Sequence, residues 1–317
     1  MKQASLAASG WTLRSKVTRR AKFLAEMEAV IPWSRLIALV EPHFPKAENG
    51  RPPHPLERML RIYFMQQWFN LSDPAMEDGL YDSESMRRFA GLDLGEEVVP
   101  DETTILRFRH LLEKHQLTEA MFNEVRGLLE QKGLLLKSGT IVDATIIAAP
   151  PSTKNAEGKR DPEMHQTRKG KDWHFGMKFH VGTTKQGLVH SLVSGPANES
   201  DFSRMGELLH GQERELYGDQ AYWSEGDRVH CEQAGIRYRV NRRPNPGAPL
   251  SRRHRLINQS RSRRRARGEH AFQIVKRLWG FAKVRYRGLH KNTVRGFAMF
   301  ALANLYLVRR RLMPHGA

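Results

Sequence analysis

The spacing of apolar residues is helical throughout the N-terminal part of the chain. From about Thr18 to Lys132, hydrophobic side chains recur every three or four positions, most regularly between Leu56 and Met65, and this period is that of an amphipathic helix. Ser72-Asp73-Pro74 predicts a helix start, since serine caps a first turn and proline is tolerated within it. We see no strand pattern in this part. An all-helical domain over residues 1–137 is therefore predicted.

The pattern changes at Ser138-Gly139. Thr140 to Ile147 is a β-branched run with alternating faces, which predicts a strand. Gly176 to Thr183 and Leu188 to Ser194 flank a turn and predict a hairpin. The later elements are predicted to be strands over 215–219 and 236–240 and helices over 201–210, 223–234, 263–279 and 293–312. This order predicts an α/β domain over 138–317, in which a hairpin-led mixed sheet is flanked by helices as in the ribonuclease-H-like fold.

Two polar segments of this second domain are predicted to be loops. Lys154 to Lys171 is charged, which predicts a mobile loop. Asn241 to Arg261 is rich in proline, glycine and arginine and has no apolar period, so a flexible basic loop is predicted around 241–261.

The charge balance points to a polyanionic partner. The chain has 52 lysines and arginines against 34 acids, a formal net charge of +18, and neutralising phosphates releases condensed counterions. Lipid is disfavoured, because the longest apolar stretch, Phe297 to Val308, contains Asn304 and is too short to span a bilayer. No secretory signal is seen at the N-terminus. The single cysteine, Cys231, excludes an internal disulfide and fits a reducing cytoplasm.

Three acidic residues are the candidates for chemistry. Asp143 is the one charged residue of the run 140–147, and burying a carboxylate there is costly unless cations or donors compensate. Asp219 ends the fourth predicted strand, and Gly218 before it permits close approach. Glu269 is the one acid between Arg242 and Arg287. Their plain structural alternatives are an exposed strand-end residue, a helix cap and a surface ion pair, respectively.

Convergent carboxylates suit one kind of reaction. Mg²⁺ takes oxygen ligands. Two such ions about 4 Å apart can activate a nucleophilic oxygen and stabilise a leaving oxygen in phosphodiester cleavage. Asp143, Asp219 and Glu269 are therefore predicted to be catalytic metal ligands. Arg265, Glu269 and Lys276 share one face of the predicted helix, which places phosphate-binding cations beside the third carboxylate.

These motifs carry a family resemblance over about Arg20 to Leu305. Arg265, three residues, Glu269, six residues and Lys276 match the signature around the catalytic glutamate of bacterial insertion-sequence transposases. The sequence resembles the insertion-sequence-five family also in the segments 55–62, 140–147, 161–166 and 173–178. It departs from the family at two places. Ser262 stands where a tyrosine often precedes the arginine, and Gln220-Ala221 follows Asp219 where a small residue and glycine are usual.

The resemblance implies a DDE transposase that cuts and joins DNA. It implies Mg²⁺ as the cofactor, with Mn²⁺ as a substitute, and an N-terminal domain that binds the terminal inverted repeats. The partners implied are double-stranded DNA of the transposon ends and of the target. Because two ends must be brought together, we expect a homodimer or a larger synaptic assembly, in the bacterial cytoplasm at the nucleoid.

Seven side chains are candidates for DNA contact. Arg265 and Lys276 flank Glu269, and Arg107 and Arg109 lie on a predicted helix from Thr103 to His115 that is one candidate for entering the major groove. Lys178 lies in the predicted strand from Gly176 to Thr183, and Trp173 and His174 precede it. His174 and Lys178 could contact a DNA end, and a half-exposed strand explains them equally well. An exposed tryptophan can stack on a base, and core packing is the alternative for Trp173.

Two other functions fit the same residues. A ribonuclease-H-like nuclease or resolvase would cut without joining. A DNA-binding regulator derived from a transposase would have lost catalysis, which the three intact carboxylates oppose.

Overall fold

A computed structural model describes residues 16–46, 52–93, 95, 97–156, 158–245 and 247–313. The chain forms two compact units. The first comprises the residues up to Met121 and those from Val308 onward, and the second runs from Phe122 to Leu307. This division lies within a helix, whereas the sequence places the domain boundary at 137–138, where the strands begin. Within the described ranges, no helix is long and apolar enough to cross a membrane.

The first unit is helical, as predicted, and its described residues contain no strand. Three helices begin at side-chain caps: Thr18 accepts a hydrogen bond from the amide of Ala21, and Ser72 and Asp101 cap in the same way. Its helices, the last of which continues into the second unit, are α2 (Arg19–Val30), α3 (Trp33–Val40), α4 (Leu56–Phe69), α5 (Asp73–Asp82), α6 (Glu84–Ala90), α7 (Glu102–Lys114) and α8 (Leu117–Gln131). The predicted helix start at Ser72 is thereby confirmed.

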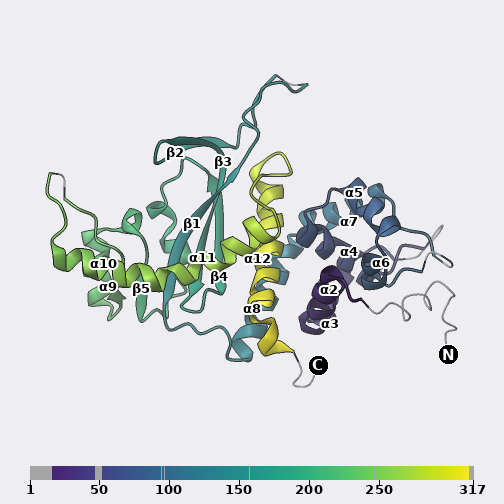
Figure 1. The fold of residues 1–317 in the computed structure, drawn as a ribbon, viewed down its shortest axis with the longest axis horizontal. Coiled ribbons are helices and arrows are strands. Elements are labelled where there is room, and N and C mark those ends of the chain that lie inside the picture. The colour runs from purple at the N-terminus through teal and green to yellow at the C-terminus, as the bar shows by residue number, and fades with distance from the viewer. Residues whose placement is uncertain are drawn as a thin grey trace. The chain divides into compact units, whose positions relative to one another are not determined.

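The second unit is built on a six-stranded mixed sheet (Figure 1). The strands are β1 (Thr140–Ala148), β2 (His165–Lys169), β3 (Asp172–Thr184), β4 (Val189–Pro196), β5 (Glu215–Tyr217) and β6 (Arg237–Tyr238). Strand β3 pairs antiparallel with β1, β2 and β4, and β5 and β6 continue the sheet from β1 in parallel. The predicted hairpin-led mixed sheet of the ribonuclease-H-like fold is confirmed.

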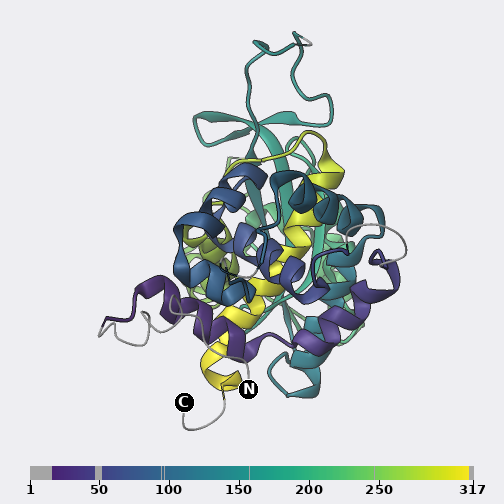
Figure 2. The same cartoon turned by 90° about the vertical axis from the view of Figure 1, so that its right-hand side faces the viewer.

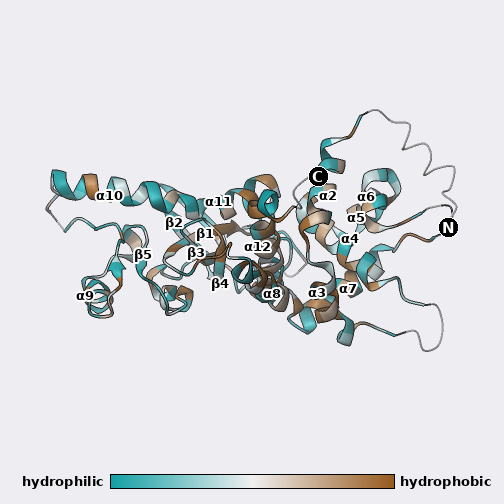
Figure 3. Ribbon diagram, turned by 90° about the horizontal axis from the view of Figure 1, so that it is seen from below, coloured by the Kyte–Doolittle hydropathy of each residue, from teal (hydrophilic) through white to brown (hydrophobic). Residues whose placement is uncertain are grey.

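Helices cover both faces of this sheet. The remaining helices are α9 (Glu225–Gln233), α10 (Arg252–Arg265), α11 (Glu269–Phe272) and α12 (Leu289–Leu312). On one face α12 packs closely, with Gly296 against the Phe179 ring, and Asn304 bonds the backbone of Val189. On the other, Val142 and Leu216 share a core with Cys231 of α9. Figure 3 shows the contrast between α12, largely hydrophobic, and α10, almost wholly hydrophilic.

Two predicted loops are partly wrong. Residues 252–261, assigned to a flexible basic loop, belong to helix α10, which begins at a side-chain cap from Ser251. His165–Lys169, assigned to a mobile loop, is strand β2. His165–Lys169 is entirely polar, and the apolar residues of 252–261 are the adjacent Leu256 and Ile257, so no apolar period marks either element. The segment joining β1 to β2 does reach beyond the sheet, as Figures 1 and 2 show.

Two predicted helices are less regular than expected. Instead of one helix over 201–210, there are two short 3-10 turns, Phe202–Arg204 and Gly206–Leu208. The predicted helix over 263–279 consists of the end of α10, a 3-10 turn at Ala266–Gly268, the single turn α11 and a π-helical turn at Gln273–Leu278.

Candidate active site

The pairing of two parallel strands brings two aspartates together. Ile141 of β1 lies opposite Tyr217 of β5. Asp143 and Asp219 each follow two residues later, on the same side of their strands. Gly218 makes the closeness possible, because a Cβ there would lie 3.1 Å from Val142 Cγ2 and 3.1 Å from Tyr222 Cβ. The aspartates therefore meet where the two strands separate.

The third carboxylate is delivered by a close helix–sheet contact. Gly268 is buried, and a Cβ on it would lie 3.0 Å from Ile141 Cγ2 and 3.1 Å from Thr183 Oγ1. The 3-10 turn thus rests directly on β1 and β3, and Glu269 follows it. A side chain at this position would require Ile141 or Thr183 to move by a few tenths of an ångström.

All three predicted catalytic residues line one cavity of about 860 Å³ in the second unit. Arg265 and Lys276 line it too, so the signature residues share one cavity although the helix that carries them is broken into several turns. Asp143 is 14% exposed and Glu269 is 44% exposed, as side chains. The cavity therefore has a buried acidic floor and a more open acidic rim.

Arg265 holds two of the carboxylates by their charge. Its Nη1 donates to Asp143 Oδ2 at 3.0 Å, and its Nη2 lies 3.4 Å from Glu269 Oε1. Asp143 also accepts a hydrogen bond from the amide of Ala144 at 3.0 Å. Even so, burial raises the pKa of Asp143 to about 6; Arg265 opposes the shift, and Asp219 and Glu269 add to it. Further positive charge would be favourable here.

Asp219 has a structural contact as well as a place in the cavity. Its Oδ1 accepts a hydrogen bond from the amide of Ala221 at 2.7 Å and caps a 3-10 turn at Gln220–Tyr222. The capping alternative considered for this residue is therefore real. It leaves Oδ2 without a hydrogen bond among the described residues, and it fixes the carboxylate at the cavity wall.

The carboxylate oxygens of Asp143, Asp219 and Glu269 are chemically suited to bind a hard divalent cation. Carboxylate oxygens are what Mg²⁺ and Mn²⁺ prefer, and the guanidinium of Arg265 shows that positive charge is accepted between Asp143 and Glu269. Within the described residues, no three or more His, Cys, Asp or Glu side chains are gathered closely enough to hold a metal ion. Holding one would require the carboxylates to rearrange around it.

Lys276 fastens the helical segment to the open edge of β1. Its Nζ donates to Ile146 O at 2.8 Å and to Thr145 Oγ1 at 3.1 Å. On this side β1 pairs with β5 up to Ile141 and bridges to Lys283 at Ala148, so within the described residues the lysine satisfies a carbonyl in the unpaired stretch between them. Burial, followed by the charges of Lys169 and Arg277, lowers the pKa of Lys276. We interpret Lys276 as a positioning residue that also presents charge to the cavity.

The predicted contacts on β3 divide into two groups. Lys178 lines the cavity, but it is 9% exposed and its Nζ donates to Asp201 Oδ1 at 2.9 Å and Glu199 O at 2.7 Å. Trp173 is 65% exposed and His174 half-buried, and neither lines this cavity. The core-packing alternative for Trp173 is therefore wrong.

The two arginines predicted on α7 differ. Arg107 is exposed. Arg109 is 6% exposed, with Nη2 2.9 Å from Asp73 Oδ2 and Nη1 2.9 Å from Glu113 Oε1. Its guanidinium is buried and forms ion pairs with both acids, so it is not available to contact DNA. The assignment of Arg109 to DNA contact is corrected accordingly.

Four charged residues line the cavity besides the predicted site residues. Arg168 and Lys169 enter it from β2, Arg277 from the π-helical turn and Asp201 from the far face of the sheet. A signal for the first two exists: Gly170 has a φ of 65° and, with Lys171, forms a two-residue turn between β2 and β3. Asp201 belongs to an acidic turn, with Asn198 and Glu199, that the sequence assigns chiefly to helix capping, with a contact to the site as the alternative, and the structure places it in the cavity.

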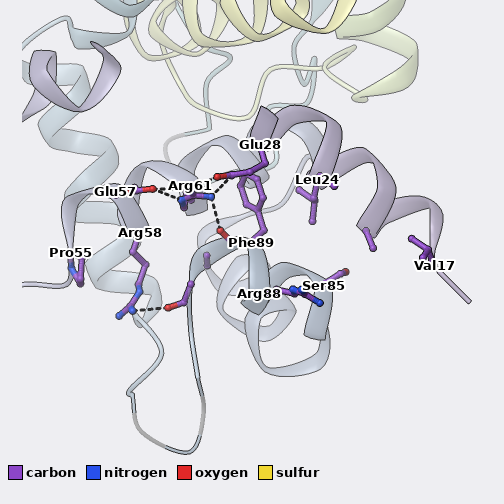
Figure 4. Close-up of a pocket in the computed structure, with 14 residues that line it drawn as sticks. Val17, Leu24, Glu28, Pro55, Glu57, Arg58, Arg61, Ser85, Arg88 and Phe89 are labelled. Atoms are coloured by element: carbon purple, nitrogen blue, oxygen red, sulfur yellow. Dashed lines mark hydrogen bonds and ion pairs between the residues drawn. The ribbon is translucent and has the colours of Figure 1, made fainter. Parts of the chain in front are cut away.

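The first unit holds a separate cavity of about 710 Å³ (Figure 4). Its charged side chains are largely paired with one another. Arg61 bonds Glu28 and Glu57 and lies 4.3 Å from the Trp33 ring centre, and Arg58 bonds Glu97 at 2.7 Å. Two carboxylates, Glu28 and Glu57, converge on Arg61, and no third acid lines this cavity among the described residues.

Comparisons with known proteins agree with this geometry. Residues 135–305 match the family described as "Transposase DDE domain". Residues 11–111 match a "Transposase domain (DUF772)". Among solved structures, the "Crystal structure of the Mos1 Strand Transfer Complex" is similar at 14% identity over 84% of this chain and 79% of that one, with a TM-score of 0.27. A likeness of that degree transfers no contact or residue role.

Proposed function

The chain belongs to the family of transposases with a DDE domain, and on that premise we propose that it cleaves DNA at the ends of an insertion sequence and joins them to a target. The observation that supports this is the meeting of Asp143, Asp219 and Glu269 in one cavity. The insertion-sequence-five subfamily is part of the proposal, and so is recognition of the terminal repeats by the domain at 1–137.

Enzymes of this family depend on divalent metal ions. We assign Mg²⁺ here, held by the three carboxylates, with Mn²⁺ as a substitute. When bound, such ions lower the pKa of an attacking oxygen and stabilise the charge on the leaving oxygen. The family binds DNA, and cleavage and joining are both in-line displacements at phosphorus, so one site serves both.

The residues of the chain itself prepare the site for this chemistry. The amides of Ala144 and Ala221 orient the two aspartates, and Arg265 balances the negative charge of Asp143 and Glu269. Arg168, Lys169 and Arg277 surround the cavity with cations that suit DNA phosphates. Arg265, Lys276, Lys178, Trp173, His174 and Arg107 remain our proposed DNA contacts.

Assembly and location extend the proposal. Joining two ends to one target requires both ends to be held together, so we propose a homodimer or larger complex on DNA, at the bacterial nucleoid. Light scattering of the protein with and without a DNA end would measure the assembly. A complex that stays monomeric on DNA would contradict it.

The test is a cleavage and joining assay on a labelled duplex that carries the repeat flanking the gene. Asp143→Asn should bind this duplex as the wild type does and lose both reactions by more than about 100-fold in Mg²⁺. Asp172→Asn, an exposed aspartate of β3 outside the cavity, is the matched control and should retain both. Full cleavage by Asp143→Asn would overturn the catalytic assignment. Cleavage without joining by the wild type would indicate a nuclease.

A further inference from the structure

A second, strongly basic hollow lies in the second unit, outside the catalytic cavity. We call it the basic cleft, a space of about 490 Å³. Its cationic side chains are Lys185, Arg237, Arg239, Arg261 and Arg264. Glu215, Tyr217 and Ser260 complete its lining. The cleft is thus a site of concentrated positive charge with a single acid.

Three elements far apart in sequence build this cleft. Lys185 comes from the turn after β3, and Arg237 comes from β6. Arg261 and Arg264 are three residues apart on α10 and share one face of that helix. This convergence does not follow from an arginine-rich helix alone, whose side chains would spread around its axis.

The acid neutralises only part of the charge. Glu215 is 5% exposed and pairs with Lys185 and, at 3.1 Å, with Arg237. Arg239 and Arg264 have no acidic partner among the described residues. Arg261 donates to the carbonyl of Val240, while its buried Nε has no hydrogen-bond partner within the described part of the chain.

The crowding has an electrostatic consequence. Burial, followed by the charge of Arg239, lowers the pKa of Arg261 from its ordinary value. Like charges held together in this way raise the free energy of the empty cleft. An anion with several acceptor oxygens would relieve the repulsion and occupy the arginine forks.

We infer that the basic cleft binds a backbone phosphate of DNA at a distance from the bond that is cut. A smaller hollow lined by Ile141, Tyr217, Arg264 and Arg267 shares residues with the cleft and extends toward the active site. Ile141 and Tyr217 precede the two aspartates by two residues, about 6.6 Å along a strand. The cleft and the smaller hollow share Lys185, Tyr217 and Arg264, and Arg265 of the active-site cavity follows Arg264 directly, which is why we place both sites on one DNA segment. The inference rests on the proposed function.

The test uses two charge-removing double variants of the full chain. Arg239→Gln with Arg264→Gln removes charge from the cleft, and neither side chain has a hydrogen bond or ion pair to break within the described ranges. Arg252→Gln with Arg255→Gln removes the same charge from exposed positions nearer the start of α10. Binding is measured by fluorescence anisotropy over a range of salt, on a duplex with the gene-flanking repeat and on an unrelated duplex of equal length.

The expected result is specific to the cleft. Its variant should bind several-fold more weakly, and the slope of log affinity against log salt should fall by about 0.9 for each phosphate that the variant no longer neutralises. The control should keep the wild-type slope. An effect on the repeat duplex alone would assign the phosphate to the transposon end, and an effect on both duplexes would assign it to DNA of any sequence.

Two results would overturn the inference. One is an unchanged slope in the cleft variant, and the other is an equal loss of affinity in both variants, which would indicate diffuse charge. Because these are binding measurements, they are independent of the cleavage test on Asp143→Asn. The inference about the cleft can be contradicted while the catalytic assignment holds. The catalytic assignment can likewise be contradicted while the cleft is shown to bind DNA.

Discussion

Asp143 and Asp219 line the same cavity because each lies two residues beyond the paired residues Ile141 and Tyr217 of neighbouring parallel strands. Their closeness is therefore a property of strand register. A shift of one residue would turn one carboxylate to the other face of the sheet. The contacts that fix this register are as important to the site as the carboxylates themselves.

Gly218→Ala tests that relationship. The added methyl group would lie 3.1 Å from both Val142 Cγ2 and Tyr222 Cβ, so β5 and the turn carrying Asp219 must move apart from β1 by a few tenths of an ångström. We expect cleavage to fall about 10-fold, since small misplacements of reacting groups are costly. Stability should fall by about 1–2 kcal/mol.

Gly226→Ala is the control for that substitution. Gly226 lies on α9, and a Cβ there would meet only Ser224 Oγ at 3.7 Å among the described residues. Urea unfolding and the cleavage assay should show no loss in this variant. If Gly218→Ala cleaved at the wild-type rate, the close approach of β5 to β1 would not be needed for activity.

Arg265 and the divalent cation should compensate for each other. Removing the guanidinium in Arg265→Gln leaves Asp143 and Glu269 without their shared cation, which should cost about 2 kcal/mol in EDTA. A cation that binds only the folded state restores stability by mass action. Millimolar Mg²⁺ should therefore stabilise Arg265→Gln more than the wild type, as urea unfolding would measure.

The exposed Arg267 supplies the comparison. Arg267→Gln removes a nearby charge without touching the carboxylates and should respond to Mg²⁺ as the wild type does. An equal response in all three proteins would mean that Arg265 and the metal do not share the same carboxylates.

His190 should make the second unit sensitive to acid. It is 1% exposed, and burial, then the charges of His210, Arg126 and Lys137, lower its pKa to about 3. Because the unfolded pKa is about 6.5, its contribution to stability is fully present above pH 6.5 and is lost as the pH falls toward 3. The loss should approach about 1.4 kcal/mol per pH unit within that window.

Replacing the histidine removes this dependence. His190→Gln cannot be protonated, so its free energy of unfolding should fall less steeply than that of the wild type between pH 6.5 and 4. The exposed His290→Gln should follow the wild type. Parallel curves for all three proteins would show that His190 is not held neutral by the fold.

Elements with a regular apolar period, and charged residues that stand alone in their segment, could be predicted from the sequence. The alternating run at 140–147, the capped start at Ser72 and the lone acid Glu269 in a basic stretch each carry a local signal. The fold class and the carboxylates Asp143 and Glu269 of the acidic cavity followed from these signals. Strand β2 and helix α10 were missed because neither has apolar residues at the spacing of a strand or a helix.

Tertiary placement was beyond the sequence. Nothing local distinguishes Arg107 from Arg109, yet one is exposed and the other is enclosed by Asp73 and Glu113. Asp201 likewise enters the cavity only because β3 and the turn after β4 bring it there. Such residues are found from tertiary contacts, and sequence patterns leave their roles open.

Arg107 and Arg109 form a matched pair for the last prediction. Arg109→Gln leaves Asp73 and Glu113 buried without their cation and should destabilise the first unit by about 3 kcal/mol. Arg107→Gln should change stability by less than about 0.5 kcal/mol, because its side chain is exposed.

If α7 contacts DNA, Arg107→Gln should also lower the slope of log affinity for DNA against log salt by about 0.9. Urea unfolding and anisotropy titrations separate the two effects. Normal stability in Arg109→Gln would refute its structural role, and an unchanged slope in Arg107→Gln would remove that arginine from the DNA interface.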